Sequence, residues 1–386
     1  MTHNPPLPPQ RRPEQEFKVA VPSVDDHVLA GRVLHLVSAH NHPVVPQSLD
    51  PVRTGYALCG PRAGIRVAEV RGVSQVPVVA DFAMHDRHLA SQDEPLRYPD
   101  EVYQTLFGEA GFYDDLRAQG ANVIMTPTGF IAGGDIAALK AVRDAVRSLG
   151  SSDVVALVPI DVAFLRKDSV DQVIAILQSI GIPIALALGG QLNPTDRYAD
   201  IVVNLRRICR EVPRLGVWRT DMITGFDCMG HGAMFAGIGA STTLRHAPPP
   251  DEKTAHFNQT GRPSVLVSDL WGYFKGDTLA RRWANSEPLP CFCAICHGRG
   301  LDRFDSTEPE VKEEALAHNV ASWSLFWSRM QPLSLVDRQA WLMDQVQRAA
   351  RAYPAENERI QQPDAFKPDK TLAKMAKLAT LLPSLP

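Results

Sequence analysis

The 386-residue chain has no apolar run long enough to cross a membrane, and its first residues lack the apolar stretch of a secretory signal. Cysteine is scarce too. Of six cysteines, Cys59, Cys209 and Cys228 stand alone, and the sequence shows none of the spread pairs of a disulfide framework. These absences exclude a membrane-spanning protein and a secreted disulfide scaffold. We therefore expect a cytoplasmic protein with no membrane partner.

An excess of charge of one sign is also missing. The chain carries 40 Lys and Arg against 43 Asp and Glu, a net charge of -3. This balance argues against a strongly basic nucleic-acid-binding domain, although basic clusters such as Arg206–Arg210 still allow one basic face on a large protein. With 45% hydrophobic residues, the composition is that of an ordinary globular protein.

Short runs rich in Val, Ile, Leu and Ala recur along the chain, and most precede a helical pattern. They span residues 32–40, 76–82, 121–129, 153–161, 182–190, 215–221, 234–241 and 264–270. Their continuous apolar character suits parallel strands buried on both faces. Eight such units predict an α/β fold, a (β/α)8 TIM barrel with insertions. An open doubly wound sheet is the alternative, but the G-x-G-x-x-G of its dinucleotide-binding form is absent.

The domain organisation follows from these patterns. We expect a disordered N-terminal arm, the barrel, a zinc-binding subdomain and a helical extension, over residues 1–20, 21–285, 286–335 and 336–386. Residues 41–75 and 83–120 are predicted insertions.

Aspartates follow four of the predicted strands. They are Asp81 after the second, Asp161 after the fourth, Asp221 after the sixth and Asp269 after the eighth. A single Asp after a strand is most often a helix cap or turn former. Four of them at the carboxyl edge of a barrel indicate a site, because catalytic groups lie there. Gly189 and Gly190 close the fifth strand and leave a backbone that a planar ligand can approach.

The remaining cysteines form the pattern Cys291-x-Cys293-x2-Cys296, and His318 follows on a predicted helix. Three thiolates and one imidazole suit Zn²⁺ in a tetrahedral site. Four protein ligands leave no open position, so the pattern predicts one structural zinc ion. His297 is an alternative fourth ligand, although it directly follows Cys296.

This cysteine pattern after the predicted eighth strand, together with a helix carrying His318 and Asn319, resembles the tRNA-guanine transglycosylase family. The resemblance covers about residues 75–330, and the family exchanges guanine in a nucleic acid for a 7-deazaguanine base. "VVADFAM" around Asp81, "VPIDVAF" around Asp161 and "ALALGGQLNPTDR" are similar to family motifs. The Ser-Gly-Gly, Gln and Pro-Thr-Arg of the tRNA enzymes are missing.

Those departures resemble the divergent branch that inserts 7-deazaguanines into DNA. The resemblance implies Asp269 as the nucleophile, Asp81 as the general acid/base, and Asp161 with the Gly189–Gly190 amides as the reader of the base. Asp221 is then a second base contact or the partner of Arg219. Phe82, with Trp218 and Trp271, is expected to sandwich the base.

The resemblance further implies DNA rather than tRNA as polymer partner, a free 7-deazaguanine base as substrate, and accessory DNA-modification proteins. The alternatives are the tRNA enzyme itself, a catalytically silent partner subunit of the same family, and an unrelated barrel hydrolase with a structural zinc.

Overall fold

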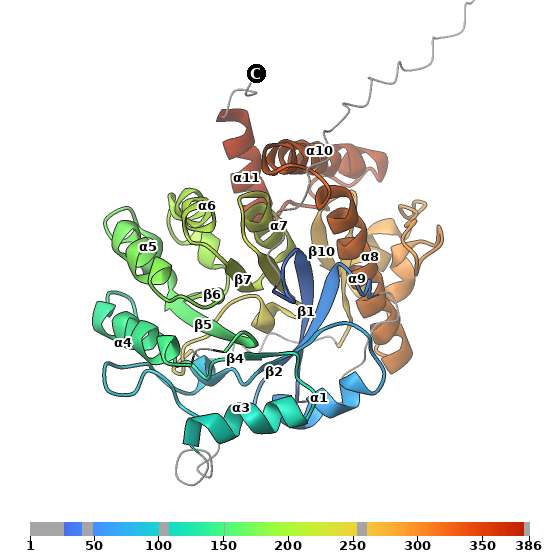
Figure 1. Ribbon diagram of the computed structural model, residues 1–386. Helices are drawn as coiled ribbons and strands as arrows, with labels where there is room; N and C mark the ends of the chain where they lie inside the picture. The colour runs from blue at the N-terminus through green and yellow to red at the C-terminus, as the bar shows by residue number, and fades with distance from the viewer. Residues whose placement is uncertain (1–26, 41–48, 100–107, 150, 253–260, 382–386) are drawn as a thin grey trace, which may run out of the picture.

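The computed structural model describes residues 27–40, 49–99, 108–149, 151–252 and 261–381. Eight parallel strands close into a barrel in chain order, with β8 paired to β1 (Figure 1). The strands are β1 Arg32–Ser38, β2 Thr54–Cys59, β3 Val78–Asp81, β4 Val123–Met125, β5 Val154–Asp161, β6 Ile184–Gly189, β7 Leu215–Thr220 and β8 Phe235–Gly239. This confirms the predicted (β/α)8 barrel. The predicted arm over residues 1–20 lies outside the described residues.

Helices follow the strands and cover the outside of the barrel. They are α1 Ala63–Arg71, α3 Gly108–Ala118, α4 Ile136–Arg147, α5 Val170–Gln178, α6 Ile201–Glu211 and α7 Met222–Gly230. Helix α6 shows why they dock: its buried Ile201, Leu205 and Ile208 recur at helical spacing and form one apolar face. Helix α4 begins where the Asp135 side chain accepts a hydrogen bond from the backbone N–H of Ala138.

Two of the strand predictions need correction. Strand β2, Thr54–Cys59, is fully buried but lies in the stretch that we predicted to be an insertion. The segment predicted as the eighth strand, 264–270, is not in the barrel. Its first residues form β9, Ser264–Val267, which pairs antiparallel with β10, Gly272–Lys275. The eight strands of the barrel are therefore complete by Gly239.

The barrel interior contains two large rings that neighbouring glycines accommodate. Trp218 on β7 and Phe235 on β8 contact each other edge to face at 6.1 Å. A Cβ atom on Gly237 would collide with Trp218, and one on Gly216 would collide with Phe235. The interior is therefore a packed core, and ligands must approach at the ends of the strands.

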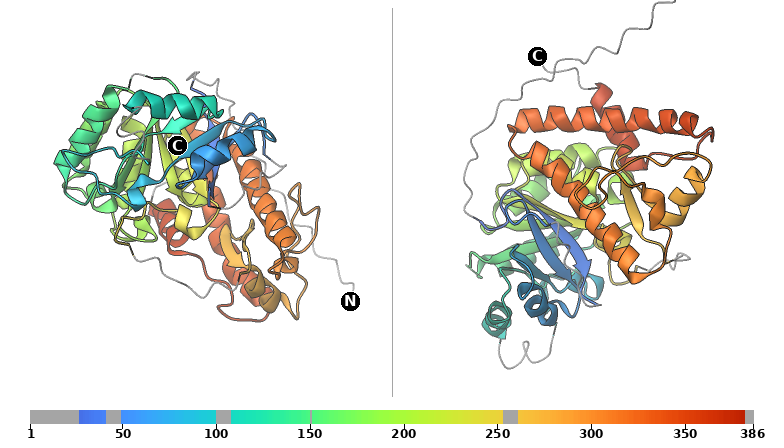
Figure 2. Two further views of the ribbon diagram at one scale, coloured as in Figure 1. Left: turned by 90° about the horizontal axis from the view of Figure 1, so that it is seen from below. Right: turned by 90° about the vertical axis from the view of Figure 1, so that its right-hand side faces the viewer.

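The C-terminal part of the chain adds four helices beside the hairpin: α8 Gly276–Trp283, α9 Pro309–Met330, α10 Leu335–Arg359 and α11 Lys370–Leu381. Figure 2 shows the long helices α9 and α10 on one flank of the barrel. The Trp327 indole on α9 donates to the Gly31 carbonyl just before β1 (2.8 Å), and Gln339 on α10 donates to the Gly230 carbonyl at the end of α7 (3.0 Å). None of the described helices has the length and apolarity needed to span a bilayer.

Candidate active site and metal centre

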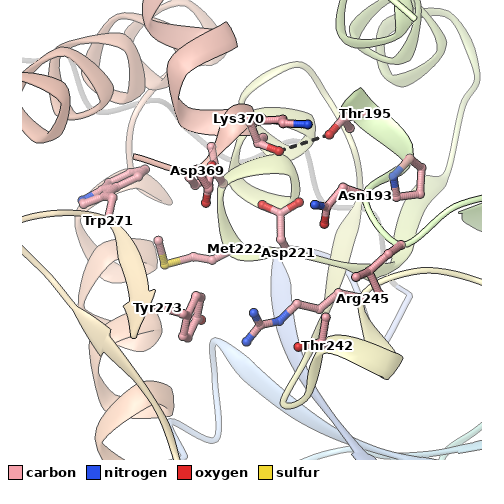
Figure 3. Close-up of a pocket in the computed structure, with 14 residues that line it drawn as sticks. Asn193, Thr195, Asp221, Met222, Thr242, Arg245, Trp271, Tyr273, Asp369 and Lys370 are labelled. Carbon is pink, nitrogen blue, oxygen red and sulfur yellow. Dashed lines mark hydrogen bonds between the residues drawn. The ribbon is translucent and has the colours of Figure 1, made fainter. Parts of the chain in front are cut away.

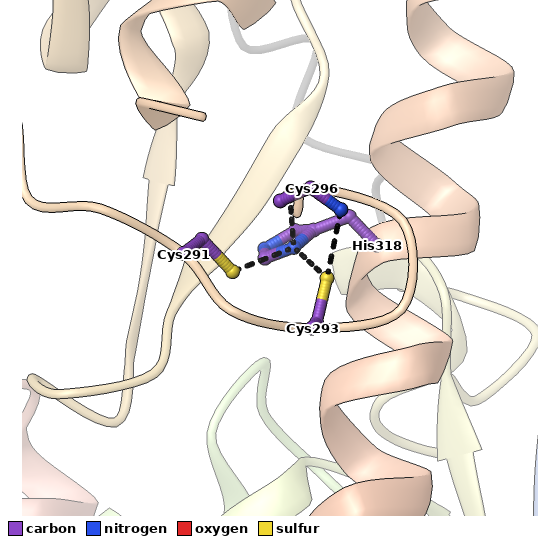
Figure 4. A group of neighbouring side chains, drawn as sticks. All are labelled: Cys291, Cys293, Cys296 and His318. Carbon is purple, nitrogen blue, oxygen red and sulfur yellow. Dashed lines mark hydrogen bonds between the residues drawn. The ribbon is translucent and has the colours of Figure 1, made fainter. Parts of the chain in front are cut away.

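The predicted metal ligands converge. One ligand atom from each of Cys291, Cys293, Cys296 and His318 lies within 4.8 Å of all the others, and all four residues are buried. Figure 4 shows the three thiols arranged around the imidazole of His318. Their sulfur atoms lie 3.6, 3.4 and 3.2 Å from His318 Nδ1, in chain order. This group can hold a metal ion, and its three sulfurs and one imidazole match the donor set that Zn²⁺ prefers.

Residues around this cysteine cluster fix the orientation of its ligands. His318 Nε2 lies 2.8 Å from the Leu266 carbonyl oxygen, to which it donates, so Nδ1 is left to face the sulfurs. Arg303 Nη2 lies 3.2 Å from Cys296 Sγ and places a positive charge beside that thiol. Asn319, the next residue after His318, bonds to the backbone of both Leu266 and Ser264. These contacts thus hold together β9, α9 and the loop that carries Cys291, Cys293 and Cys296, which we call the cysteine loop.

At the carboxyl edge of the barrel, Asp81 at the end of β3 is completely buried. Its Oδ2 accepts hydrogen bonds from Trp218 Nε1 at 2.9 Å and from Arg219 Nε at 3.3 Å, and its Oδ1 accepts from the Ala83 N–H. Burial alone would raise the pKa of Asp81, but Arg219, His85 and these hydrogen bonds together hold the pKa below its ordinary value. The acid/base role of Asp81 stays a prediction, and these contacts favour a structural role.

The structure corrects two expectations, one about the position of Phe82 and one about the ion-pair partner of Arg219. Phe82 does not face the carboxyl edge. Its ring packs 5.3 Å from that of Phe112, in the layer between the barrel and its outer helices. Arg219 pairs with Asp81 and not with Asp221, whose side chain instead caps α7 by accepting from Thr224.

Three residues predicted to read a base do lie together. Asp161 on β5 stands opposite Gly189 on β6 in the parallel register. A Cβ atom on Gly190, whose φ is +89°, would lie 2.5 Å from Asp161 Oδ2, so only glycine fits beside this carboxylate. Arg197 Nη1 approaches the same Oδ2 at 3.4 Å. The edge between β5 and β6 therefore places a carboxylate that is 17% exposed directly against the backbone of Gly190.

Asp221, after β7, faces a cavity of about 90 Å³ that sequence reasoning missed. Figure 3 shows the Asp221 and Asp369 carboxylates pointing into this space, with Asn193 beside them. Arg245 lies below, its guanidinium 4.0 Å from the centre of the Tyr273 ring. The cavity thus combines two acids, the cations Arg245 and Lys370, and one phenol from four parts of the chain: the β7 end, the loop after β8, the hairpin, and the start of α11.

Burial raises the pKa of two carboxyl groups in and near this cavity. It raises the pKa of Asp369 to about 6, and the nearby Asp221 and Asp196 charges add to the effect. Burial also raises the pKa of Asp196, against the opposing charges of Lys370 and Lys374. A carboxylic acid that keeps its proton to about pH 6 suits general acid/base work, and such groups cluster at functional sites.

The sequence offers only a weak sign of Asp369. In "KPDKTLAK" this residue reads as the N-cap of the last helix, and it does accept a hydrogen bond from the Leu372 N–H at 2.7 Å. The place of Asp369 in the cavity with Asp221 depends on how α11 packs against the barrel. The Thr371 hydroxyl lies 3.2 Å from that of Thr195, and Lys374 donates to the Thr195 carbonyl.

Asp269 lies elsewhere, in the turn between β9 and β10, and no barrel strand carries it to the carboxyl edge. It lines a groove of about 590 Å³ beside Cys291, Phe292 and Cys293. Burial and the charge of Glu356 raise its pKa. Trp271, two residues on, is also outside the barrel strands and packs against Phe326 with ring centres 5.0 Å apart, but it does line the cavity that Asp221 faces.

No protein-family model matches the sequence, and no curated protein matches it either. Among solved structures, the chain is similar to the 4-hydroxy-tetrahydrodipicolinate synthase of Methylacidiphilum fumariolicum SolV, with a TM-score of 0.25 and 12% identity. That match covers 56% of this chain and 69% of the synthase, and a likeness this weak carries no argument about activity.

Proposed function

We propose that this chain is a transglycosylase that exchanges guanine in DNA for a free 7-deazaguanine base. The observation that carries the proposal is the pair of carboxylates, Asp221 and Asp369, that face one cavity at the carboxyl edge of the barrel. Exchange at a glycosidic carbon needs one carboxylate to capture the sugar and one acid to protonate the departing base. The cysteine cluster adds support, because it is the most specific part of the resemblance to this family.

In the proposed first half-reaction, the Asp221 carboxylate attacks C1′ of the target nucleotide. The bond between C1′ and N9 of guanine breaks, Asp369 gives its proton to the leaving guanine, and the sugar remains esterified to Asp221. In the second half-reaction, Asp369 takes the N9 proton of the incoming 7-deazaguanine. N9 then attacks C1′ and releases Asp221. Two displacements retain the configuration at C1′.

These roles differ from those that the family resemblance implied. Asp269 is replaced as nucleophile because it lies on the hairpin, and Asp81 as acid because it is buried and paired with Arg219. Asp161 keeps its role in the proposal from the β5–β6 edge, beside the cavity that Asp221 and Asp369 face and not in its lining. Its carboxylate can accept two hydrogen bonds from N1–H and the exocyclic amine of guanine, a charge-assisted contact. Guanine and 7-deazaguanine share this edge, so one reader serves both the outgoing and the incoming base.

A metal ion at the cysteine cluster would act as a structural clamp. Four protein ligands fill a tetrahedral shell, and such closed sites hold a fold together without binding substrate. Bound there, zinc would join the cysteine loop to α9. The target nucleotide must leave the base stack to reach the end of a barrel strand, so base flipping is part of the proposal.

A second candidate is a catalytically silent partner subunit of the same family. Strand β8 ends at Gly239 and is followed by Ala240 and Ser241, so it offers no carboxylate at the carboxyl edge. Together with the pairing of Asp81 to Arg219, this favours a chain that supports chemistry performed by another subunit.

Incorporation of labelled guanine into duplex DNA and into bulk tRNA tests the proposal. Wild type should label DNA, Asp221→Asn should lose at least a hundredfold in rate, and Asp144→Asn, an exposed carboxylate on α4, should match wild type. Labelling of tRNA alone would identify the tRNA reaction. Absence of labelling in both polymers, with protein that binds metal and is folded, would contradict the proposal and favour the silent subunit.

A further inference from the structure

A second ligand site lies outside the barrel, in the groove of about 590 Å³ that contains Asp269. Its walls are the β9–β10 turn, the cysteine loop, α9 and α10. Leu325 and Phe326 of α9 form an apolar part of the wall, and Asp269, Phe292, Arg329 and Arg348 are its polar or aromatic rim. The volume falls in the range of pockets that hold small ligands or single nucleotides.

Phe292 is the most informative residue of this groove. Its side chain is 80% exposed, and it is the only exposed phenylalanine among the described residues. It stands between Cys291 and Cys293, two of the candidate metal ligands. The Cys291 backbone is further held by hydrogen bonds with Arg299 and Gly298. The ring is therefore displayed to solvent from a backbone that is anchored on both sides, which suits a stacking surface prepared in advance.

The opposite rim carries positive charge. Arg329 lies in the last turn of α9, is exposed, and forms no ion pair with another described residue. Arg348 on α10 is exposed as well, and it pairs with Asp344 on the same helix at 2.8 Å. The Arg329 guanidinium can contact a phosphate directly, and that of Arg348 can do so by exchanging its exposed pair with Asp344, because arginine binds phosphate through parallel hydrogen bonds.

We propose that this groove binds an unpaired nucleotide of the polynucleotide substrate. The base stacks on Phe292, its phosphate contacts Arg329 and Arg348, and Asp269 accepts hydrogen bonds from N–H groups of the base. An aromatic ring facing two arginines is the combination that grips single-stranded nucleic acid. The inference rests on the proposed function in that the substrate is a nucleic acid, and it adds a second contact away from the exchange site.

The groove is tested by binding of a fluorescein-labelled, guanine-containing single-stranded DNA oligonucleotide to the full-length, zinc-loaded chain. Phe292→Ala should weaken binding about tenfold, the loss expected for one stacked base. Phe292→Trp should restore it. Arg329→Gln and Arg348→Gln should each lower the slope of log affinity against log salt by about one. Arg143→Gln, at a partly exposed arginine on α4 that also pairs with a neighbouring Asp, is the control and should bind like wild type.

Unfolding midpoints of every variant exclude loss of fold as the cause. If Phe292→Ala and both arginine variants bind the oligonucleotide as tightly as wild type, the groove proposal is wrong. Because the readout is binding, it is separable from base exchange. If the variants bind more weakly but the wild-type chain has no exchange activity, the groove proposal is supported and the transglycosylase proposal is contradicted. If the variants bind like wild type and the wild-type chain exchanges bases, the transglycosylase proposal is supported and the groove proposal is contradicted.

Discussion

Arg219 and Asp81 form a buried ion pair across the barrel, between the ends of β7 and β3. Their Nε and Oδ2 atoms are 3.3 Å apart, and the side chains are 4% and 0% exposed. Trp218, the residue before Arg219, donates to the same carboxylate oxygen. Two strands that are not neighbours in the sheet are thus tied together at the edge where the active site is expected.

Removing the charge of Asp81 should destabilise the fold strongly. Asp81→Asn leaves the buried Arg219 guanidinium without its hydrogen-bonded counter-charge, which costs about 3–5 kcal/mol of unfolding free energy. Urea denaturation at neutral pH measures this cost. The control is Asp144→Asn, which breaks an exposed pair with Arg143 and should change stability little. Equal stabilities of the two variants would show that the buried pair does not hold the barrel edge.

The ion pair also predicts acid sensitivity. The folded state holds the pKa of Asp81 below its ordinary value of 3.8. Its contribution is therefore present above about pH 3.8 and is lost as the pH falls and the carboxylate is protonated. Asp81→Asn should remove this part of the acid transition, and urea midpoints between pH 3 and pH 7 check it. A wild-type curve parallel to that of the variant would contradict the expectation.

Asp369 should behave in the opposite way. Its pKa rises from 3.8 to about 6 in the folded state, so its contribution to stability is greatest below pH 3.8 and is lost as the pH rises to about 6. Asp369→Asn keeps the helix cap on the Leu372 N–H and avoids burying a charge. We expect this variant to be about 1–3 kcal/mol more stable than wild type at pH 7.5 but similar at pH 4.

Asp369→Asn should at the same time lose base exchange, because an amide cannot supply the proton. This combination of gained stability and lost activity distinguishes a functional acid from a structural one. Thermal unfolding at both pH values and exchange assays on one preparation measure it. A stability difference that does not grow between pH 4 and pH 7.5 would argue against a raised pKa.

Metal removal should loosen the C-terminal half of the protein. Elemental analysis should find one zinc per chain, and chelation should lower the unfolding temperature, because the metal is bound only by the folded arrangement of Cys291, Cys293, Cys296 and His318. Cys296→Ser should lose the zinc. Cys59→Ser, at a buried cysteine outside the cluster, should keep it. A chelated protein that unfolds at the same temperature as the loaded one would remove the structural role of the metal.

The barrel and the cysteine cluster could be predicted from the sequence because each produces a local sequence pattern. Buried parallel strands read as continuous apolar runs, and the spacing of Cys291, Cys293 and Cys296 restricts them to one tight loop. Strand β2 was not predicted because it begins at Thr54 and Gly55, among turn-forming residues. "SVLV" at 264–267 is as apolar as a barrel strand, and only its pairing with β10 places it outside.

The acids show the limit of reasoning from strand ends. Asp161 and Gly190 meet because neighbouring strands in a parallel sheet set their register, which sequence order predicts. Asp369 and Asp221 are far apart in the sequence, and they line the same cavity because α11 packs on the barrel. No local sequence pattern predicts that packing. The misplacement of Asp269 followed directly from counting β9 as a barrel strand.

The most direct test asks which carboxylate captures the sugar. Wild-type protein is incubated with duplex DNA, denatured, digested with nuclease and protease, and its peptides are analysed by mass spectrometry. The account predicts a deoxyribosyl nucleotide adduct on the peptide containing Asp221 and none with Asp221→Asn. An adduct on the peptide of Asp269 or Asp81, or base exchange without any adduct at Asp221, would contradict it.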